Sequence, residues 1–418
     1  MQDVTHRDTC RLCGSHSFEL VLPILPSAIG DAFVTKDQLD EKQGVYPLDT
    51  YLCLDCGLLQ NLDIVNPDLL FRNYTYRTSA SLGLVEHFRK YASSVVEGLG
   101  IPKDSLVAEI GSNDGSLLKA FKALGMRVQG VDPARSIAGI ATSEGVPTVP
   151  DFFTSAVADD ILSRSGKASL VCANNVFAHA DGMEDIVSGI RKLLTDDGAF
   201  VFEVSYAPYM ADNMVFDVIY HEHVSHYAIA PLEKFFNRLD MTFFDVEAQM
   251  TKGGSIRGFA QPKSTGKRPR SQRLLDMMAE EERRGVTKPQ MYRDFYAAVQ
   301  DRKKQTLDYL DAQIAAGKTV AAYGASTTTT TLMYHFELGS RVSFIVDDNS
   351  VKHGTYSPGL HIPVYPSSEL LSRRPDIVVV LAWTYWEPIT KRNAQFIAEG
   401  GEFLVPLPNF RLINKDKS

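Results

Sequence analysis

The densest cluster of polar side chains in this 418-residue chain lies at positions 220–227, which read Tyr-His-Glu-His-Val-Ser-His-Tyr. Histidine titrates near neutral pH and is the commonest general base. A lone buried histidine usually only satisfies hydrogen bonds, but three histidines, two tyrosines and a glutamate within eight residues indicate a site. A metal site at His221 and His223 is an alternative, although no third ligand follows at the spacing of His-Glu-x-x-His. We therefore predict proton-transfer chemistry here.

Four of the five cysteines form two Cys-x-x-Cys pairs, Cys10/Cys13 and Cys53/Cys56, and each pair is followed by a glycine. Each pair can bring two sulfurs to one side of a tight turn, and four thiolates complete a tetrahedral zinc site. The alternative is a set of unrelated buried thiols. The pattern favours structural zinc, and because all four ligand positions are filled, we expect no catalytic role for the metal.

A glycine-rich turn at positions 109–115 follows an apolar strand and precedes a helix. Its glycines let the backbone approach a ligand at the carboxyl end of the strand. The turn contains Glu109 and Asp114, which would repel a pyrophosphate but suit the cationic methyl donor S-adenosylmethionine. Asp132, at the end of the next strand, can accept hydrogen bonds from ribose hydroxyls; an ordinary α/β turn is the alternative. The residues expected at this cofactor site are Glu109, Gly111, Asn113, Asp114, Gly115, Asp132, Asp151, Phe152 and Asn175.

Elements that could position these groups follow from the hydrophobic pattern. Residues 71 to about 250 alternate apolar strands with helical stretches, residues 260–315 are helical and charged, and a second alternation of strands and helices begins at Lys318. The second alternation contains the turn Tyr323 to Thr327, whose N–H groups and hydroxyls at a helix start suit a diphosphate. Lys252 and Arg257 could supply positive charge. Trp383 follows a buried strand, where it could stack on a nucleotide base or pack between domains.

The composition excludes several classes of protein. A net charge of -8 and a basic stretch that alternates with acids argue against a nucleic-acid partner. No apolar stretch is long enough to cross a bilayer, and positions 1–8 lack the apolar core of a signal peptide. We therefore expect a cytoplasmic, monomeric protein with no membrane partner.

Taken together, these residues resemble the zinc-containing sugar C-methyltransferases that act on nucleotide-diphosphate-linked 4-keto-deoxysugars. The resemblance covers nearly the whole chain, and its most specific parts are Tyr-His-Glu-His at 220–223 and Gly-Gly-Ser-x-Arg at 253–257. The remaining parts are the cysteine pairs, Tyr-x-Tyr at 74–76, the glycine-rich turn, Asn-x-x-x-His at 175–179 and Gly-Ala-Ser-Thr at 324–327. The five threonines at 327–331 and Trp-Thr-Tyr at 383–385 depart from the family pattern, which leaves the nucleotide and the sugar open.

The resemblance implies an α/β protein with a small zinc-binding domain (1–70), a central Rossmann-like methyltransferase domain (71–255), a helical connector (256–315) and a second Rossmann-like domain (316–418) that holds the nucleotide sugar. It implies methylation of a ring carbon next to the ketone, through an enolate formed by His223, in deoxysugar biosynthesis. The catalytic residues would be His223, Glu222, Tyr220, His179 and Tyr76. The substrate-binding residues would be Lys252, Ser255, Arg257, Tyr323, Gly324, Ser326, Thr327 and Trp383.

Two other functions remain open at this point. An O- or N-methyltransferase of another small metabolite would share the cofactor turn and the base but would need no ketone. A zinc-ribbon RNA-modifying methyltransferase would share the cysteines, although the acidic balance counts against it.

Overall fold

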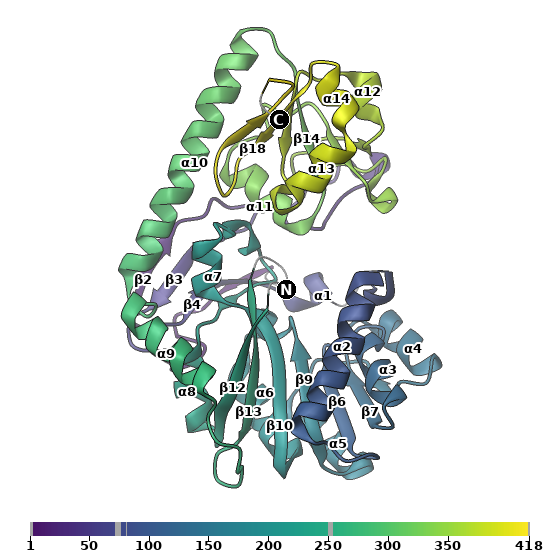
Figure 1. The fold of residues 1–418 in the computed structure, drawn as a ribbon, viewed down its shortest axis with the longest axis vertical. Coiled ribbons are helices and arrows are strands. Elements are labelled where there is room, and N and C mark those ends of the chain that lie inside the picture. The colour runs from purple at the N-terminus through teal and green to yellow at the C-terminus, as the bar shows by residue number, and fades with distance from the viewer. Residues whose placement is uncertain (1–2, 72–76, 81, 250–253, 417–418) are drawn as a thin grey trace.

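The computed structural model describes residues 3–71, 77–80, 82–249 and 254–416, and Figure 1 shows how its sheets are arranged. The described residues form sheets of two, seven, four and six strands. Tyr76 and Lys252 lie outside the described residues. Among the helices of the described part of the chain, none is long and apolar enough to cross a membrane.

The seven-stranded sheet forms the core of the central domain, which lies in the lower half of Figure 1. Its strands are, in spatial order, β12 (Met241–Gln249), β13 (Ser255–Pro262), β10 (Leu194–Ser205), β9 (Ala168–Asn174), β6 (Leu106–Ile110), β7 (Arg127–Val131) and β8 (Thr148–Val149). The five strands from β10 to β8 are parallel, and β13 runs antiparallel to both of its neighbours. The strands that follow β6 in the sequence, β7 and β8, lie on one side of it, and the next strand, β9, lies on its other side. Ligands of open α/β sheets bind at the carboxyl ends of the strands next to such a switch point.

Apolar strands with two buried faces explain why this sheet forms. Val107 belongs to one apolar cluster and its neighbour Ala108 to another, and Leu170 and Val171 of β9 alternate in the same way. Such near-continuous apolar runs are typical of parallel strands covered by helices on both faces. The helices on the face of Val107 are α2 (Leu82–Leu99), α3 (Ser116–Ala123) and α4 (Arg135–Ser143). Those on the face of Ala108 are α5 (Ser155–Ser165), α6 (Met183–Leu193) and α8 (Ile229–Arg238).

The amino-terminal region forms small antiparallel sheets beside the central domain. The two-stranded sheet pairs β1 (Val4–His6) with β5 (Asp63–Val65), and α1 (Pro67–Phe71) follows it. The four-stranded sheet has the order β11 (Ser225–His226), β4 (Leu59–Asn61), β3 (Thr50–Cys53) and β2 (Phe18–Leu22). Strand β11 comes from the histidine-rich segment, so that segment completes a sheet of the cysteine-containing region.

The 39 residues between Cys13 and Cys53 include a long excursion onto the carboxyl-terminal domain. Residue Leu25 donates its backbone N–H to His335 Nδ1 at 3.2 Å, and Lys352 donates to Asp31 at 2.7 Å. The sequence suggests only a β excursion of this length, because contacts over some 300 positions leave no local signal.

Two helices, α9 (Gln272–Arg284) and α10 (Pro289–Ala315), connect the central sheet to the carboxyl-terminal domain, and α10 runs along one side of the molecule in Figure 1. The expected connector starts at residue 256, but residues 255–262 form β13 inside the central sheet. The charged helical pattern begins after this strand. We therefore propose that the central domain extends to Pro262.

The carboxyl-terminal domain contains the six-stranded sheet, in the order β16 (Val364–Pro366), β15 (Ile345–Asp347), β14 (Val320–Tyr323), β17 (Ile377–Val380), β18 (Glu402–Val405) and β19 (Arg411–Ile413). All of its neighbouring pairs are parallel except β18 with β19. Its helices are α11 (Thr327–His335), α12 (Glu369–Arg373), α13 (Trp386–Arg392) and α14 (Ala394–Ala398). The expected second Rossmann-like domain is thus confirmed.

Candidate active site and zinc centre

The four paired cysteines come together in the structure. Their sulfur atoms lie within 4.8 Å of one another, with 3.6 Å between Cys10 and Cys56 and 3.5 Å between Cys13 and Cys53. Four thiolates at zinc–sulfur distances of about 2.3 Å stand about 3.8 Å apart in a tetrahedron, whereas a disulfide is much shorter. The quartet therefore fits a zinc ion, and the predicted metal site is confirmed.

Backbone and side-chain groups support the sulfurs. Gly14 and Gly57 have φ angles of 73° and 87°, a conformation that favours glycine. The side-chain amide of Gln60 donates to Cys10 Sγ at 3.2 Å. Because Gln60 lies opposite Ser225 in the β4–β11 ladder, the zinc centre is joined to the histidine-rich segment by one step across a sheet.

The glycine-rich turn has the backbone that its residues require. Gly111, Asn113 and Gly115 have φ angles of 67°, 48° and 72°. Asp132 is only 7% exposed and accepts hydrogen bonds from the backbone N–H groups of Asn113 at 2.8 Å and Ala134 at 2.9 Å. A carboxylate has about four acceptor sites, so Asp132 can hold the turn and still accept from a ribose hydroxyl.

Acidic groups surround this turn. Glu109 is 3% exposed, and one of its carboxylate oxygens has no hydrogen-bond partner. Burial, together with the nearby Asp132 and Asp114, raises the pKa of Glu109 well above its usual range. Burial also works against ionisation of Asp114, but hydrogen bonds from Ser116 and Ser79 outweigh it and lower the pKa of Asp114. A buried carboxyl oxygen of Glu109 without a partner, near two other acids, fits a cationic ligand such as S-adenosylmethionine, whose positive charge would favour ionisation of Glu109.

A short segment that the sequence analysis missed covers the turn. The backbone N–H of Thr78 donates to Asn113 Oδ1, and that of Ser79 donates to Asp114, both at 2.9 Å. Arg77 lies 3.8 Å from Asp114. These residues carry no motif of their own, and only the neighbouring Tyr-x-Tyr pattern hinted that this stretch matters.

The other expected cofactor residues lie at the same edge of the sheet. Asp151 and Phe152 follow β8, and Asp151 accepts a hydrogen bond from the backbone N–H of Phe152. Asn175 follows β9 with a φ of 56° and donates its backbone N–H to the carbonyl of Glu203 at 2.8 Å. The structure therefore brings the four strand ends of the predicted cofactor site, those of β6, β7, β8 and β9, to one edge of the sheet.

We expect Asp132→Ala to weaken binding of S-adenosylhomocysteine by at least about tenfold, because charge-assisted hydrogen bonds contribute about 1.5–3 kcal/mol. The change removes the acceptor of two backbone N–H groups and the expected acceptor of the ribose. Titration calorimetry measures the effect, and Asp104→Asn, on an exposed carboxylate before β6, is the matched control. An unchanged dissociation constant for Asp132→Ala would remove Asp132 from the cofactor site.

The side chain of His223 is buried and held in one orientation. It is 6% exposed, and its Nδ1 lies 2.7 Å from the carbonyl oxygen of Val218. A carbonyl can only accept, so Nδ1 carries the proton and Nε2 keeps its lone pair in the neutral ring. Tyr220 Oη lies 2.9 Å from Nε2. The ring is thus set up to take a proton at Nε2.

The histidine-rich segment lies against the region that follows β9. The backbone N–H of Val224 donates to the carbonyl of Ala178 at 2.8 Å. Ala178 is the middle residue of the 3-10 helix η3 (Phe177–His179). The rings of His179 and His223 have centroids 5.0 Å apart. A Cβ on Gly111 would lie 2.3 Å from the side chain of Val176, so the same loop also packs over the cofactor turn. The predicted base and the predicted cofactor site therefore adjoin.

The other two histidines of the segment are buried, and burial lowers the pKa of both. His221 Nε2 lies 3.2 Å from the carbonyl oxygen of Tyr46, and burial lowers the pKa of His221 to about 4. His226 is 2% exposed in β11, and burial lowers its pKa to about 3.

Glu222 is 8% exposed beside His223. Within the described ranges, the side chains that gather as a metal site are the cysteines and not His221 and His223.

Arg257, expected at the diphosphate, is instead used inside the central domain. It is 5% exposed and donates from Nε and Nη2 to Glu203 at 2.9 and 2.6 Å, and from Nη1 to Glu247 at 3.3 Å. Its guanidinium also lies 4.1 Å from the ring centre of Tyr91. The positive charge of Arg257, which the sequence suggested for binding a phosphate, is thus paired with two carboxylates of the central domain. Ser255 is buried at the start of the same strand.

Trp383 also has a partner inside the protein. It is 5% exposed, and its indole N–H donates to Asp217 at 2.9 Å across the two domains. Burial raises the pKa of Asp217 to about 7. Of the two alternatives for Trp383, the structure places it in the interdomain contact.

The turn between β14 and α11 has mixed character. Gly324 has a φ of 118°, and a Cβ there would lie 2.8 Å from Ala382. Tyr323 donates its hydroxyl to Asp348 at 2.8 Å, and burial raises the pKa of Tyr323 to about 12. Asp347 accepts the N–H of Ala325 at 2.6 Å. An acid from β15 thus reaches a turn whose own sequence contains none. The remaining polar side chains of the turn are the exposed Ser326, whose hydroxyl lies 3.2 Å from that of Thr328, and the half-buried Thr327.

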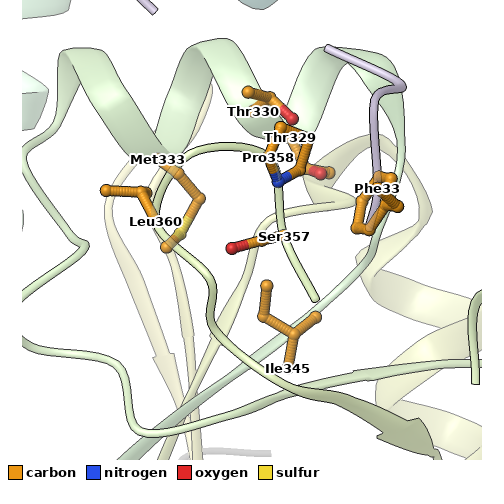
Figure 2. A pocket seen from close by; sticks show the side chains of 8 residues that line it. All are labelled: Phe33, Thr329, Thr330, Met333, Ile345, Ser357, Pro358 and Leu360. Carbon is orange, nitrogen blue, oxygen red and sulfur yellow. The ribbon is translucent and has the colours of Figure 1, made fainter. Parts of the chain in front are cut away.

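A cavity of about 10 Å³ lies beneath α11 (Figure 2). It is lined by Phe33, Thr329, Thr330, Met333, Ile345, Ser357, Pro358 and Leu360. Such a volume holds about one water molecule, so it is too small for a nucleotide or a sugar.

Comparisons with known proteins agree with this geometry. Family models described as zinc binding domain, methyltransferase domain and C-methyltransferase C-terminal domain match residues 10–71, 84–243 and 250–408. The C-methyltransferase NovU of Streptomyces niveus is 34% identical to this chain over 100% of both proteins.

Two solved structures also resemble part of the chain. The magnesium protoporphyrin IX methyltransferase ChlM of Synechocystis PCC 6803, solved with bound SAM, covers 42% of this chain and 80% of its own at 16% identity, with a TM-score of 0.32. The CcbJ methyltransferase of Streptomyces caelestis covers 42% of this chain and 89% of its own at 14% identity, with a TM-score of 0.34.

The full-length match to NovU and the three family models, which follow one another along the chain, agree with the cysteine quartet and the acidic cofactor turn. This chain belongs to the family of zinc-binding, S-adenosylmethionine-dependent C-methyltransferases.

Proposed function

We propose that this C-methyltransferase methylates a ring carbon next to the ketone of a nucleotide-diphosphate-linked 4-keto-deoxysugar, with His223 as the base. The observation that carries the proposal is the fixed imidazole of His223. Its Nδ1 donates to Val218 O at 2.7 Å, and its Nε2 lies 2.9 Å from Tyr220 Oη. A base at a methyltransferase site is needed when the atom to be methylated is a carbon that first has to lose a proton.

The chemistry assigns one task to each group. A proton on carbon next to a ketone is acidic enough for an imidazole to remove when the enolate oxygen is stabilised. His223 Nε2 takes this proton, and the Val218 carbonyl stabilises the resulting imidazolium through Nδ1–H. The Tyr220 hydroxyl and His179 are the described groups nearest to His223 that can donate to the enolate oxygen, and Tyr76 is proposed with them from the sequence. Glu222 would orient the neighbouring groups.

S-adenosylmethionine, when bound, supplies the methyl group as an electrophile on a cationic sulfur and leaves as S-adenosylhomocysteine. Asp132 would hold its ribose, and Glu109 and Asp114 would favour its positive charge. The adenine would lie near Phe152, because this half-buried ring follows β8 at the same edge of the sheet.

The nucleotide of the substrate is proposed to lie against the carboxyl-terminal domain. Ser326 and Thr327, at the start of α11, provide hydroxyl groups for the diphosphate, and the helix start favours negative charge. Arg257 and Trp383 are left out of this site, because both have partners within the protein. Lys252 stays a sequence-based candidate.

The test is an assay with methyl-labelled S-adenosylmethionine and a panel of nucleotide 4-keto-6-deoxysugars, followed by NMR of the product. We expect a new methyl group on a ring carbon. When S-adenosylhomocysteine replaces the methyl donor, we expect the proton on the carbon next to the ketone to exchange in heavy water. A methyl group on oxygen or nitrogen would remove the enolate role of His223. Transfer to carbon of an unrelated ketone, but to none of the sugars, would leave the base in place and overturn the substrate.

A further inference from the structure

The carbonyl that orients His223 belongs to a very short element. Val218 is the last residue of the 3-10 helix η4 (Phe216–Val218), and its oxygen accepts from His223 Nδ1 at 2.7 Å. A single 3-10 turn has poor hydrogen-bond geometry and little stability of its own. The position of this carbonyl must therefore be set by what packs against η4.

The first group that packs against η4 is Trp383 of the carboxyl-terminal domain. Its indole Nε1 donates to Asp217 Oδ2 at 2.9 Å, and the two residues are 5% and 3% exposed. The other oxygen, Asp217 Oδ1, has no hydrogen-bond partner in the described structure. Among the described residues, Trp383 is the side chain that donates a hydrogen bond to this buried carboxyl group. Loss of its N–H would therefore leave the side chain of Asp217 without a side-chain donor.

Helix α11 and Phe336, the residue that follows it, also contact η4 and the residue after it. Thr331 Oγ1 donates to the carbonyl of Ile219 at 2.9 Å, and the ring of Phe216 stacks on that of Phe336 with centroids 5.5 Å apart and an angle of 8°. Contacts with the carboxyl-terminal domain therefore fix the residues on both sides of Val218. Thr331 belongs to the run of five threonines at 327–331, of which the sequence analysis gave a role only to Thr327.

We infer that Trp383, Asp217 and Thr331 are positioning residues for the reaction. Through them the carboxyl-terminal domain holds the Val218 carbonyl against His223 Nδ1 and so selects the tautomer in which Nε2 is unprotonated and can act as the base. This inference rests on the proposed role of His223. It gives the carboxyl-terminal domain a part in proton transfer in addition to any part in holding the substrate.

The first test compares the two tryptophans of the chain. Trp383→Phe keeps an aromatic ring but removes the N–H, and Trp386→Phe is the matched control, because Trp386 is half-buried and packs on Arg411. We expect Trp383→Phe to lower kcat about tenfold or more, since small misplacements of catalytic groups cost up to about 100-fold. The KM for the keto-sugar should change less than about twofold, because the indole N–H that is removed binds Asp217 and has no part in the proposed nucleotide site.

The second test uses rescue by a conservative variant. Asp217→Leu removes the acceptor, whereas Asp217→Asn keeps an oxygen for the indole N–H, so we expect loss of kcat only in the leucine variant. Thr331→Val, which removes the hydroxyl at nearly constant volume, should lower kcat in the same way. An equal loss in Asp217→Leu and Asp217→Asn, or a loss confined to KM, would overturn the inference.

A spectroscopic readout separates this inference from the proposed function. In protein labelled with 15N-histidine, the His223 signals, identified by their absence in His223→Gln, should show a protonated Nδ1 in the wild type. We expect a mixture of tautomers in Trp383→Phe and Asp217→Leu. An unchanged tautomer in both variants would refute the positioning role even if no sugar is methylated, and a changed tautomer would support it whatever the substrate proves to be.

Discussion

We expect His223→Ala to lower kcat by about a thousandfold or more, since general base catalysis contributes roughly 10² to 10⁴ and no other described group occupies the position of Nε2. The alanine variant should bind S-adenosylhomocysteine as the wild type does, because His223 binds Val218 and Tyr220 and packs beside His179, and none of these three is an expected cofactor residue. Single-turnover methyl transfer and titration calorimetry measure the two quantities.

His221→Gln is the matched control for this prediction. His221 lies two positions away, is equally buried and contacts the carbonyl of Tyr46, so its replacement should leave kcat within a few-fold of the wild type. Retained turnover in His223→Ala would remove it from the role of base. A larger loss in His221→Gln than in His223→Ala would move that role to the neighbouring histidine.

Replacing one zinc ligand should have the largest effect on stability. We expect Cys53→Ser to lose most of the bound zinc and to lower the melting temperature by on the order of 10 °C, because loss of a metal site costs more than about 4 kcal/mol. Cys53 is fully buried and ends β3, so the variant leaves an incomplete ligand set within a packed core. Elemental analysis and scanning calorimetry measure zinc content and melting temperature.

Activity should be lost together with the metal, for a reason visible in the fold. Strand β4 of the cysteine region pairs with β11, and the N–H of Asn61 donates to the carbonyl of Val224 at 3.0 Å, one residue after His223. Cys172→Ala, at the fifth cysteine, which lies buried in β9, is the control and should keep one equivalent of zinc. Full zinc content and an unchanged melting temperature in Cys53→Ser would show that the quartet is not a structural metal site.

Several features could be predicted from the sequence because their information is local. A Cys-x-x-Cys pair with a following glycine forms its turn from neighbouring residues, and two such pairs have few uses other than metal binding. The glycine-rich turn also contains, within a few positions, both the backbone freedom and the acids that the cofactor needs. The histidine-rich segment concentrates its polar groups within eight residues, so its composition alone indicated a site.

The tertiary structure decided which polar and aromatic groups are already occupied. Arg257 and Trp383 are residues that a phosphate or a nucleotide base would also attract, but Glu203 and Asp217 bind them, from 54 and 166 positions away. Neither spacing leaves a pattern in the sequence. The tautomer of His223 was likewise undetermined, because it depends on the carbonyl of Val218 and on the domain that holds that carbonyl. Local chemistry could therefore be read from the sequence, whereas the partner of each charge and each N–H was fixed only when distant segments packed together.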